Sequence, residues 1–151
     1  MANKDTPAKI EVSDMNIYQL NAIRVQLEQE IELRGRSVEQ LIVLMNRFKE
    51  SEMSVFKQSQ LSANNEILVP LTTSMYVNGV VKDNKKFLVD IGTGYYVEKD
   101  LESALDYFSR KVKYLNGEID RLTKTIQTKI NMRDNIIADF QYKTQQNVAT
   151  N

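Results

Sequence analysis

The sequence predicts an α protein with a small β insert: an antiparallel two-helix coiled coil with two β-hairpins (four short strands) at one end. Two observations lead to this prediction. Apolar residues recur at heptad spacing on both sides of a middle segment, and the middle segment is rich in β-branched and aromatic residues. The prolines, Pro7 and Pro70, leave both flanking arms without an internal helix breaker. We expect one domain over residues 1–151, with a first helix at about 13–62, hairpins at 63–99 and a second helix at 100–146.

The first arm carries two interleaved core positions that repeat every seven residues. Arg24 and Arg34 are the charged exceptions among them; the positions are Ile17, Arg24, Ile31, Val38 and Met45, and Leu20, Leu27, Arg34, Leu41, Phe48 and Val55. The second arm repeats the pattern with Lys129 and Arg133 as exceptions, at Leu101, Phe108, Leu115, Leu122, Lys129 and Ile136, and at Leu105, Val112, Ile119, Ile126, Arg133 and Phe140. Heptads sustained over this length favour a coiled coil over an ordinary globular helix.

The matched lengths of the two arms predict that they lie side by side. If the middle segment reverses the chain, Arg34 falls opposite Lys129 and Glu30 opposite Arg133. All four charged exceptions then lie in the half of the coil away from the strands. Since burying an unpaired cation is costly, we expect that half to be the looser one.

The middle segment reads as four short strands separated by turn residues. The predicted strands are 67–71, 75–81, 87–91 and 95–97, with turns at 72–74, 82–86 and 92–94. Gly92 and Gly94 are expected to adopt positive φ in a tight hairpin turn. By local rules, Asn78-Gly79 also scores as a hairpin turn, which conflicts with a continuous strand there.

Composition excludes several kinds of chemistry. The chain has no cysteine and no histidine, which removes disulfides, thiolate nucleophiles, zinc–thiolate sites and the usual catalytic triads. Its 20 basic and 20 acidic side chains balance, so bulk charge gives no attraction to nucleic acid or anionic membranes. We expect no catalytic residue, no metal site, no cofactor, and neither nucleic acid nor membrane as a partner.

Weaker candidates for chemistry have commoner structural explanations. Gly92-Thr93-Gly94 lacks the third glycine of a dinucleotide fingerprint and leads into a strand. Charged groups that could hold a metal ion or contact nucleic acid have the spacing of a solvated helix face and of turns: Glu28, Glu30, Glu32, Asp83, Asp90, Lys82, Lys85 and Lys86. The N-terminal residues lack the apolar segment of a signal peptide, and the longest apolar run, Leu41–Met45, is far too short to span a bilayer. We therefore expect a cytoplasmic chain.

Two sets of apolar residues are the candidate functional surfaces. The first lies near the charged exceptions of the coil, where packing against the partner helix competes with an exposed binding patch for polypeptide: Tyr18, Ile23, Val25, Met132, Ile137, Phe140 and Tyr142. The second supplies more apolar surface than two hairpins can bury alone and is the candidate assembly surface: Ile67, Val69, Leu71, Tyr76, Val81, Leu88, Ile91 and Tyr96.

Two strings in the middle segment carry a family resemblance. Leu68-Val69-Pro70-Leu71-Thr72-Thr73-Ser74-Met75-Tyr76-Val77, and Leu88-Val89-Asp90-Ile91-Gly92-Thr93-Gly94-Tyr95-Tyr96-Val97-Glu98-Lys99, within a helix–strands–helix layout, closely resemble the α-class prefoldin subunits. The similarity covers roughly residues 14–145. In that family the strand runs through the equivalent glycine, so Asn78-Gly79 is interpreted as a bulge.

The resemblance implies a function that composition alone does not. It implies a hetero-hexameric co-chaperone in which this chain joins β-class subunits and a second α-class subunit through a β-barrel platform. The coiled-coil tips would hold unfolded polypeptides, of the actin and tubulin type, and deliver them to the cytosolic group II chaperonin without ATP. It also leaves a nuclear pool open. The alternatives are a structural coiled-coil spacer or dimerisation module and, less favoured by the balanced charge, the helical arm of an enzyme.

Overall fold

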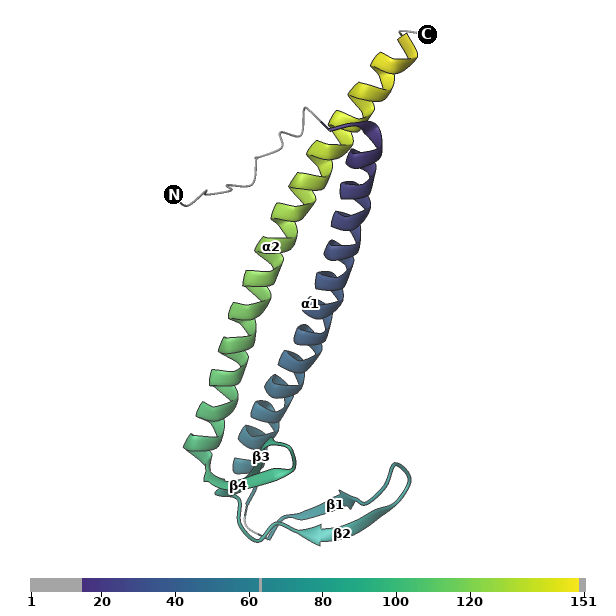
Figure 1. The fold of residues 1–151 in the computed structure, drawn as a ribbon. Coiled ribbons are helices and arrows are strands. Elements are labelled where there is room, and N and C mark those ends of the chain that lie inside the picture. The colour runs from purple at the N-terminus through teal and green to yellow at the C-terminus, as the bar shows by residue number, and fades with distance from the viewer. Residues whose placement is uncertain (1–14, 63, 150–151) are drawn as a thin grey trace, which may run out of the picture. The chain divides into compact units, whose positions relative to one another are not determined.

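The computed structural model describes residues 15–62 and 64–149 and has the predicted fold class (Figure 1). The elements follow in the order α1 (Ile17–Ser59), β1 (Glu66–Pro70), β2 (Tyr76–Val80), β3 (Lys86–Gly92), β4 (Tyr95–Asp100) and α2 (Leu101–Ala149). The chain divides into two compact units. We call Met1–Gln40 with Ile119–Asn151 the terminal unit, and Leu41–Glu118 the hairpin unit.

The ends of α1 are set by side-chain caps. Asn16 and Gln19 form a reciprocal capping box: Gln19 N donates to Asn16 Oδ1 at 2.8 Å, and Asn16 N donates to Gln19 Oε1 at 2.9 Å. The cap starts the helix at Ile17, so the prediction of helix at residues 15–16 was wrong, while residues 13–14 lie outside the described part. At the other end Asn84 donates to the carbonyl oxygens of Ser59 and Leu61, which stops α1 three residues before the predicted end.

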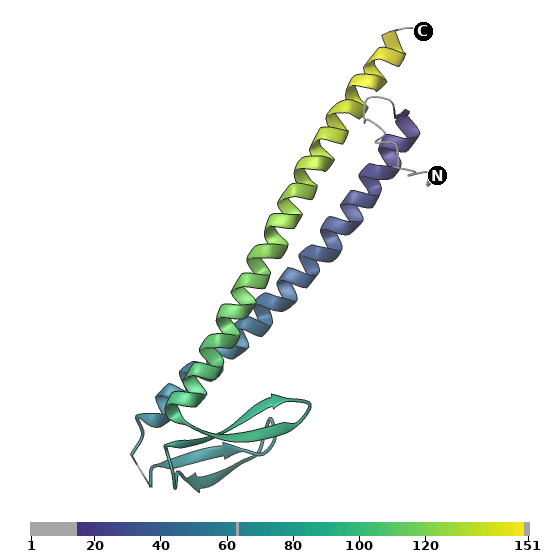
Figure 2. The ribbon, with the colours of Figure 1, turned by 60° about the vertical axis from the view of Figure 1, so that its left-hand side comes forward.

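Asp100 caps α2, which begins at Leu101, one residue after the predicted start. Its Oδ1 accepts a hydrogen bond from Ser103 N at 2.9 Å, the arrangement of an N-cap. The helix continues to Ala149, three residues beyond the predicted end. Within each unit α1 and α2 lie side by side and run antiparallel (Figures 1 and 2).

The terminal unit is held by a small apolar core between the two helices. Leu20 is fully buried and packs with Leu27 and Ile136, and partly buried Met15, Ile23 and Phe140 complete the cluster. The predicted placement of Glu30 opposite Arg133 was wrong, since Arg133 pairs with Asp134. Glu30 faces Lys129, with Oε2 and Nζ 2.5 Å apart, rather than Arg133.

The charged exceptions of the coil do not remain unpaired. Arg34 and Lys129 both bind the carboxylate of Glu30. Arg24 pairs with Glu28 at 3.6 Å, and Arg133 pairs with its neighbour Asp134 at 2.7 Å. The cost of unpaired cations, on which the expectation of a looser half rested, is therefore avoided, because acidic neighbours beside the core positions neutralise them.

The hairpin unit has its own core where β3 meets both helices. Val89, Ala104 and Phe108 are buried together, with Phe48, Val55, Phe87 and Tyr107 packed around them. The rings of Tyr107 and Phe108 meet edge-on, with centroids 5.4 Å apart, and the rings of Phe48 and Phe108 lie 6.3 Å apart.

The strands form two separate antiparallel hairpins, β1–β2 and β3–β4. Asn78 pairs with Leu68 and Gly79 pairs with Ile67 in an unbroken register. The interpretation of Asn78-Gly79 as a bulge was therefore wrong, although the strand does continue through it.

The register irregularity lies instead in β3, between Asp90 and Gly92. Asp90 Oδ1 accepts from Gly92 N at 2.8 Å beside it. The positive φ angles predicted for Gly92 and Gly94 are confirmed at 125° and 81°, and Thr93 between them has a φ of 51°. Positive φ at both Thr93 and Gly94 is what a type I′ hairpin turn requires.

Candidate assembly and polypeptide-binding surfaces

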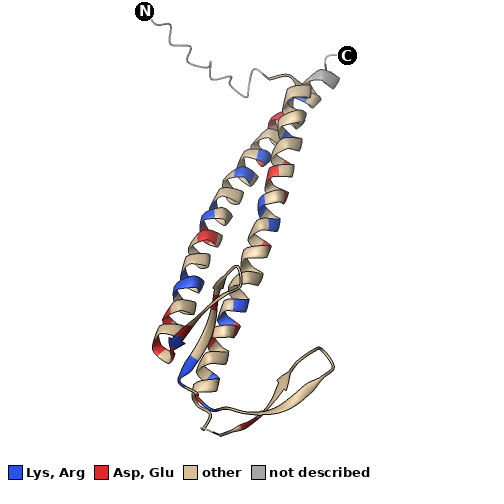
Figure 3. Cartoon of the chain, turned by 60° about the horizontal axis from the view of Figure 1, so that its bottom comes forward, with Lys and Arg blue, Asp and Glu red and all other residues tan. Residues whose placement is uncertain are grey.

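Hairpin β1–β2 is an uncharged arm. No charged residue occurs between Glu66 and Lys82, and Figure 3 shows this hairpin without acidic or basic side chains apart from its base. Large apolar side chains on it are more than two fifths exposed: Leu68, Leu71, Met75, Tyr76, Val77 and Val80. Transfer of exposed apolar side chains from water into a protein interface is favourable. This hairpin is therefore suited to contact with a partner protein.

Hairpin β3–β4 has one covered face and one open face. Phe87 and Val89 point to the helices, and Val89 is only 3% exposed. Leu88, 72% exposed, and Tyr96, 63% exposed, remain open to solvent, and the ion pair Lys86–Glu98 joins β3 to β4 at 2.8 Å. That hydrogen bond to Glu98 raises the pKa of Lys86 above its ordinary value.

All four strands are sheet edges. Each hairpin has only two strands, and each strand in the described part of the chain has one hydrogen-bonded neighbour. The outer backbone groups of such strands can pair with a further strand from another chain. Two-stranded sheets are marginal alone, so this end of the chain is suited to assembly.

The structure sorts the predicted assembly residues into three groups. Five are exposed: Leu71, Tyr76, Leu88, Ile91 and Tyr96. Ile67 and Val69 are half-buried on the face that carries Gly79. Val81 is 7% exposed and its backbone bonds to Asn64 and Asn65, so it belongs to the core of its own chain, not to a free surface.

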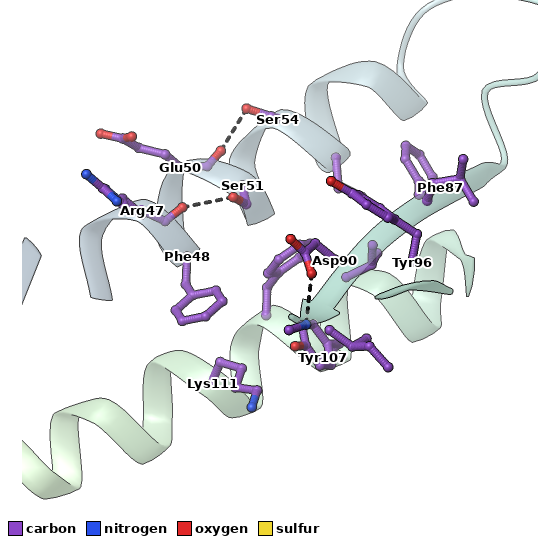
Figure 4. Close-up of a pocket in the computed structure, with 16 residues that line it drawn as sticks. Arg47, Phe48, Glu50, Ser51, Ser54, Phe87, Asp90, Tyr96, Tyr107 and Lys111 are labelled. Carbon is purple, nitrogen blue, oxygen red and sulfur yellow. Dashed lines mark hydrogen bonds between the residues drawn. The ribbon is translucent and has the colours of Figure 1, made fainter. Parts of the chain in front are cut away.

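A groove of about 850 Å³ lies in the hairpin unit between β3 and the two helices (Figure 4). Its apolar walls include Phe48, Val55 and Phe108. Charged side chains also line it, with Arg47 and Glu50 from α1, Asp90 from β3 and Lys111 from α2. Lys111 and Lys99 both lie over the Tyr107 ring, at 5.5 and 5.8 Å from its centroid, so one of the groove's cations is also held by an aromatic face.

The predicted polypeptide-binding residues in the terminal unit also divide. Tyr18 (86% exposed), Tyr142 (63%), Met132 (51%) and Val25 (38%) reach solvent. Ile23 and Phe140 pack against the core of Leu20, Leu27 and Ile136, and Ile137 is half-buried. For Ile23 and Phe140 the competing explanation, packing between the helices, therefore holds in the chain alone.

Sequence reasoning missed several exposed apolar residues. Leu33 in the terminal unit is 66% exposed, and Leu68, Tyr95 and Val80 stand open on the hairpins. Leu33 lies outside the heptad core positions, and that offset is the signal that could have identified it.

The charges around these surfaces are mixed in sign. Figure 3 shows acidic and basic residues interspersed along both helices. Hydrogen bonds from Lys129 and then Arg34 hold the pKa of the partly buried Glu30 below the ordinary value. Among residues 15–62 and 64–149 no group of three or more acidic side chains is arranged to hold a metal ion. In the same part, neither helix combines the length and apolarity needed to cross a membrane.

Comparison with known proteins identifies the family to which this chain belongs. The family described as "Prefoldin subunit" matches residues 17–146. The chain belongs to the prefoldin subunit family. Human prefoldin subunit 5 is 36% identical over 137 residues, which cover 91% of this chain and 89% of the human protein. The probable prefoldin subunit 5 of Drosophila melanogaster is 37% identical over 145 residues, covering 94% and 86%.

The prefoldin fold is found in a solved structure as well. A chain of the filamentous PFD from Methanocaldococcus jannaschii superposes with a TM-score of 0.71 at 21% identity, covering 79% of this chain and 98% of that chain. The resemblance seen in the strands is thus confirmed: the Gly-Thr-Gly-Tyr-Tyr-Val-Glu-Lys string points to eukaryotic prefoldin subunit 5, and such subunits are the relatives found. Prefoldin is a chaperone family, and this chain is a prefoldin chaperone subunit that assembles with other prefoldin subunits.

Proposed function

We propose that this chain is one subunit of a hetero-hexameric prefoldin that holds unfolded polypeptides and delivers them to the cytosolic group II chaperonin without ATP. Its partners would be β-class subunits and a second α-class subunit, and its clients proteins of the actin and tubulin type. The complex would act in the cytoplasm, with a nuclear pool left open. Delivery, clients and ATP independence rest on the family resemblance.

The open hairpins carry the proposal. Leu88, Tyr96 and Leu68 are each more than three fifths exposed on strands whose outer edges are unpaired. At roughly 25 cal/mol per Å² of apolar surface, covering several such side chains supports a stable interface. A structural spacer whose strands only capped the two helices would not require exposed apolar side chains on those strands.

The terminal unit supports the holding of clients. Tyr18, Val25, Met132 and Tyr142 offer exposed apolar contact. Aromatic and methionine side chains adapt to many partners. One such surface contributes only a kcal/mol or two after the entropy of ordering a chain is subtracted, so useful affinity requires several subunits at once.

Native mass spectrometry of this chain co-expressed with the other prefoldin subunits tests the assembly part. We expect a hexamer that contains this chain together with both subunit classes. A monomer or homodimer that ignores those subunits would contradict the proposal and favour a dimerisation module. Dilution of denatured actin into the complex, with and without ATP, tests the rest: we expect equal protection from aggregation, and protection that requires ATP would contradict it.

A further inference from the structure

Glu30 joins α1 to α2 in the terminal unit. Its Oε2 lies 2.5 Å from Lys129 Nζ on α2 and 2.9 Å from Arg34 Nη1 on α1. The three side chains are only 31%, 21% and 33% exposed. Lys129 and Arg34 both stand at heptad core positions, so this single carboxylate neutralises two cations that the coil places at its seam.

The apolar pattern does not by itself fix how the helices align. A slip of seven residues returns every core position to a core position. Something besides the repeat must choose among these alignments.

We propose that Glu30, held between Arg34 and Lys129, is the residue that sets the helix register of the terminal unit. In the observed register Lys129 meets a carboxylate. A slip of seven residues places Lys129 opposite Ser37 or Ile23, and neither carries a negative charge. Leaving a half-buried ammonium without its partner penalises both slipped alignments.

Other contacts in the terminal unit carry less information about register. The pairs Arg24–Glu28, Arg36–Glu32 and Arg133–Asp134 each lie within one helix and survive any slip. Lys143 also reaches across, to the carbonyl oxygen of Met15 at 2.5 Å, but that contact lies before the start of α1 and away from the charged seam positions. The carboxylate of Glu30 is available at a single position along α1, so its ion pair with Lys129 depends on how the two helices are aligned.

The register can be measured in the full chain because it has no native cysteine. Spin labels at Ala22→Cys and Thr123→Cys, both exposed, report the alignment through their electron–electron distance. In the observed pairing these positions lie about 20 Å apart along the coil, and a slip of one heptad changes that by about 10 Å. Labelled chain diluted into unlabelled chain keeps the distance intramolecular.

Three variants separate register from simple loss of charge. Glu30→Lys places three cations together, and we expect a second distance population displaced by up to about 10 Å along the axis. Glu32→Lys makes the same charge change on an exposed residue of α1 and should keep the single parental distance. The inverted set Glu30→Lys with Arg34→Glu and Lys129→Glu should restore the parental distance.

Two results would overturn the proposal. One is a Glu30→Lys chain with parental helicity by circular dichroism and only the parental distance. The other is an inverted set that does not recover the parental distance. If Glu30→Lys unfolds the terminal unit, the inverted set alone decides, since its recovery supports the proposal and its failure contradicts it.

Discussion

Val69 occupies the space that a side chain at Gly79 would need: its Cγ2 lies 2.9 Å from where a Cβ at residue 79 would stand. Gly79 pairs with Ile67 inside hairpin β1–β2, so it is neither a turn nor a bulge. A glycine within a strand usually marks a close approach of this kind. The absence of a side chain at Gly79 therefore lets Val69 of β1 pack closely against β2.

Gly79→Ala should therefore loosen this hairpin. The added methyl group must displace Val69, and overpacking of this kind costs about 1–3 kcal/mol. Hydrogen exchange of the β1 and β2 amides should accelerate while exchange in α2 stays unchanged. Adding Val69→Ala removes the obstructing methyl groups and should restore part of the protection; no difference between wild type and Gly79→Ala would contradict the assigned contact.

The helix glycines should respond in the opposite direction. A Cβ at Gly35 or Gly117 would meet nothing within 4 Å, and both residues lie inside helices. Gly35→Ala and Gly117→Ala should each stabilise the chain by up to about 1 kcal/mol, because alanine loses less backbone entropy in a helix. Thermal unfolding followed by circular dichroism measures this, and a lowered midpoint would show that the glycines have a packing role.

The sequence predicted the helices, the hairpins and the positive-φ turn well because each depends on local chemistry. Heptads specify long helices, and Gly92 and Gly94 specify the turn. Pairing across the two helices was the weak point, because a repeat is compatible with several alignments and Glu30 binds Lys129 rather than Arg133. The interpretation of Asn78-Gly79 was wrong because Gly79 makes room for the side chain of Val69 on the paired strand and does not form a turn or a bulge.

The sequence identified the apolar residues of the candidate surfaces, but it did not always predict which of them are exposed to solvent. Leu88 and Tyr96 stand open, whereas Val81 is buried by its own chain. Phe140 and Ile23 fill the terminal core, while Leu33 is exposed. Which side of an apolar residue faces solvent depends on the helix register and on the strand pairing, and neither was available from a repeat pattern alone.

Asp100 should make stability depend on acid pH. Its hydrogen bonds with Ser103, including the cap to the backbone amide, hold its pKa below the ordinary value of 3.8. The charged cap therefore stabilises the fold fully above the ordinary pKa, and this contribution is lost as the pH falls through the lowered pKa. Asp100→Ala should lower the unfolding midpoint at neutral pH, with the difference from wild type shrinking in acid.

Asp100→Asn is the control for that effect. Its amide oxygen can still cap α2 but does not titrate, so it should be more stable than Asp100→Ala by an amount that does not change with pH. Thermal melts of the three chains across the acid range are the measurement. A gap between wild type and Asp100→Ala that stays constant down to the lowest pH would rule out the charged cap.

Charges on the open face of the second hairpin should block assembly. Leu88→Lys with Ile91→Lys places two ammonium groups on side chains that are 72% and 47% exposed, so the isolated chain should keep its helicity. Burying those charges at an interface is costly, and incorporation into the hetero-oligomer should be lost. Tyr114→Lys, on the outside of α2 and 66% exposed, is the matched control and should assemble normally. Wild-type incorporation of the double variant in native mass spectrometry would contradict the assembly surface.

The most direct test of the account is capture of a denatured client by complexes that differ only in the exposed apolar residues of the terminal unit. Deleting the helix ends would also remove the fully buried Leu20, so substitution is cleaner. The test set is Tyr18→Ser, Val25→Ser, Met132→Ser and Tyr142→Ser. The control set lies in the hairpin unit and is similarly exposed on average: Val43→Ser, Met53→Ser, Phe56→Ser and Tyr114→Ser.

Both complexes are first shown to have wild-type composition, and light scattering then follows aggregation of diluted denatured actin. We expect the test set to lose part of the protection, since the other subunits still bind, and the control set to protect like wild type. Undiminished protection by the test set, or an equal loss in both sets, would contradict the account that the terminal unit holds unfolded polypeptide.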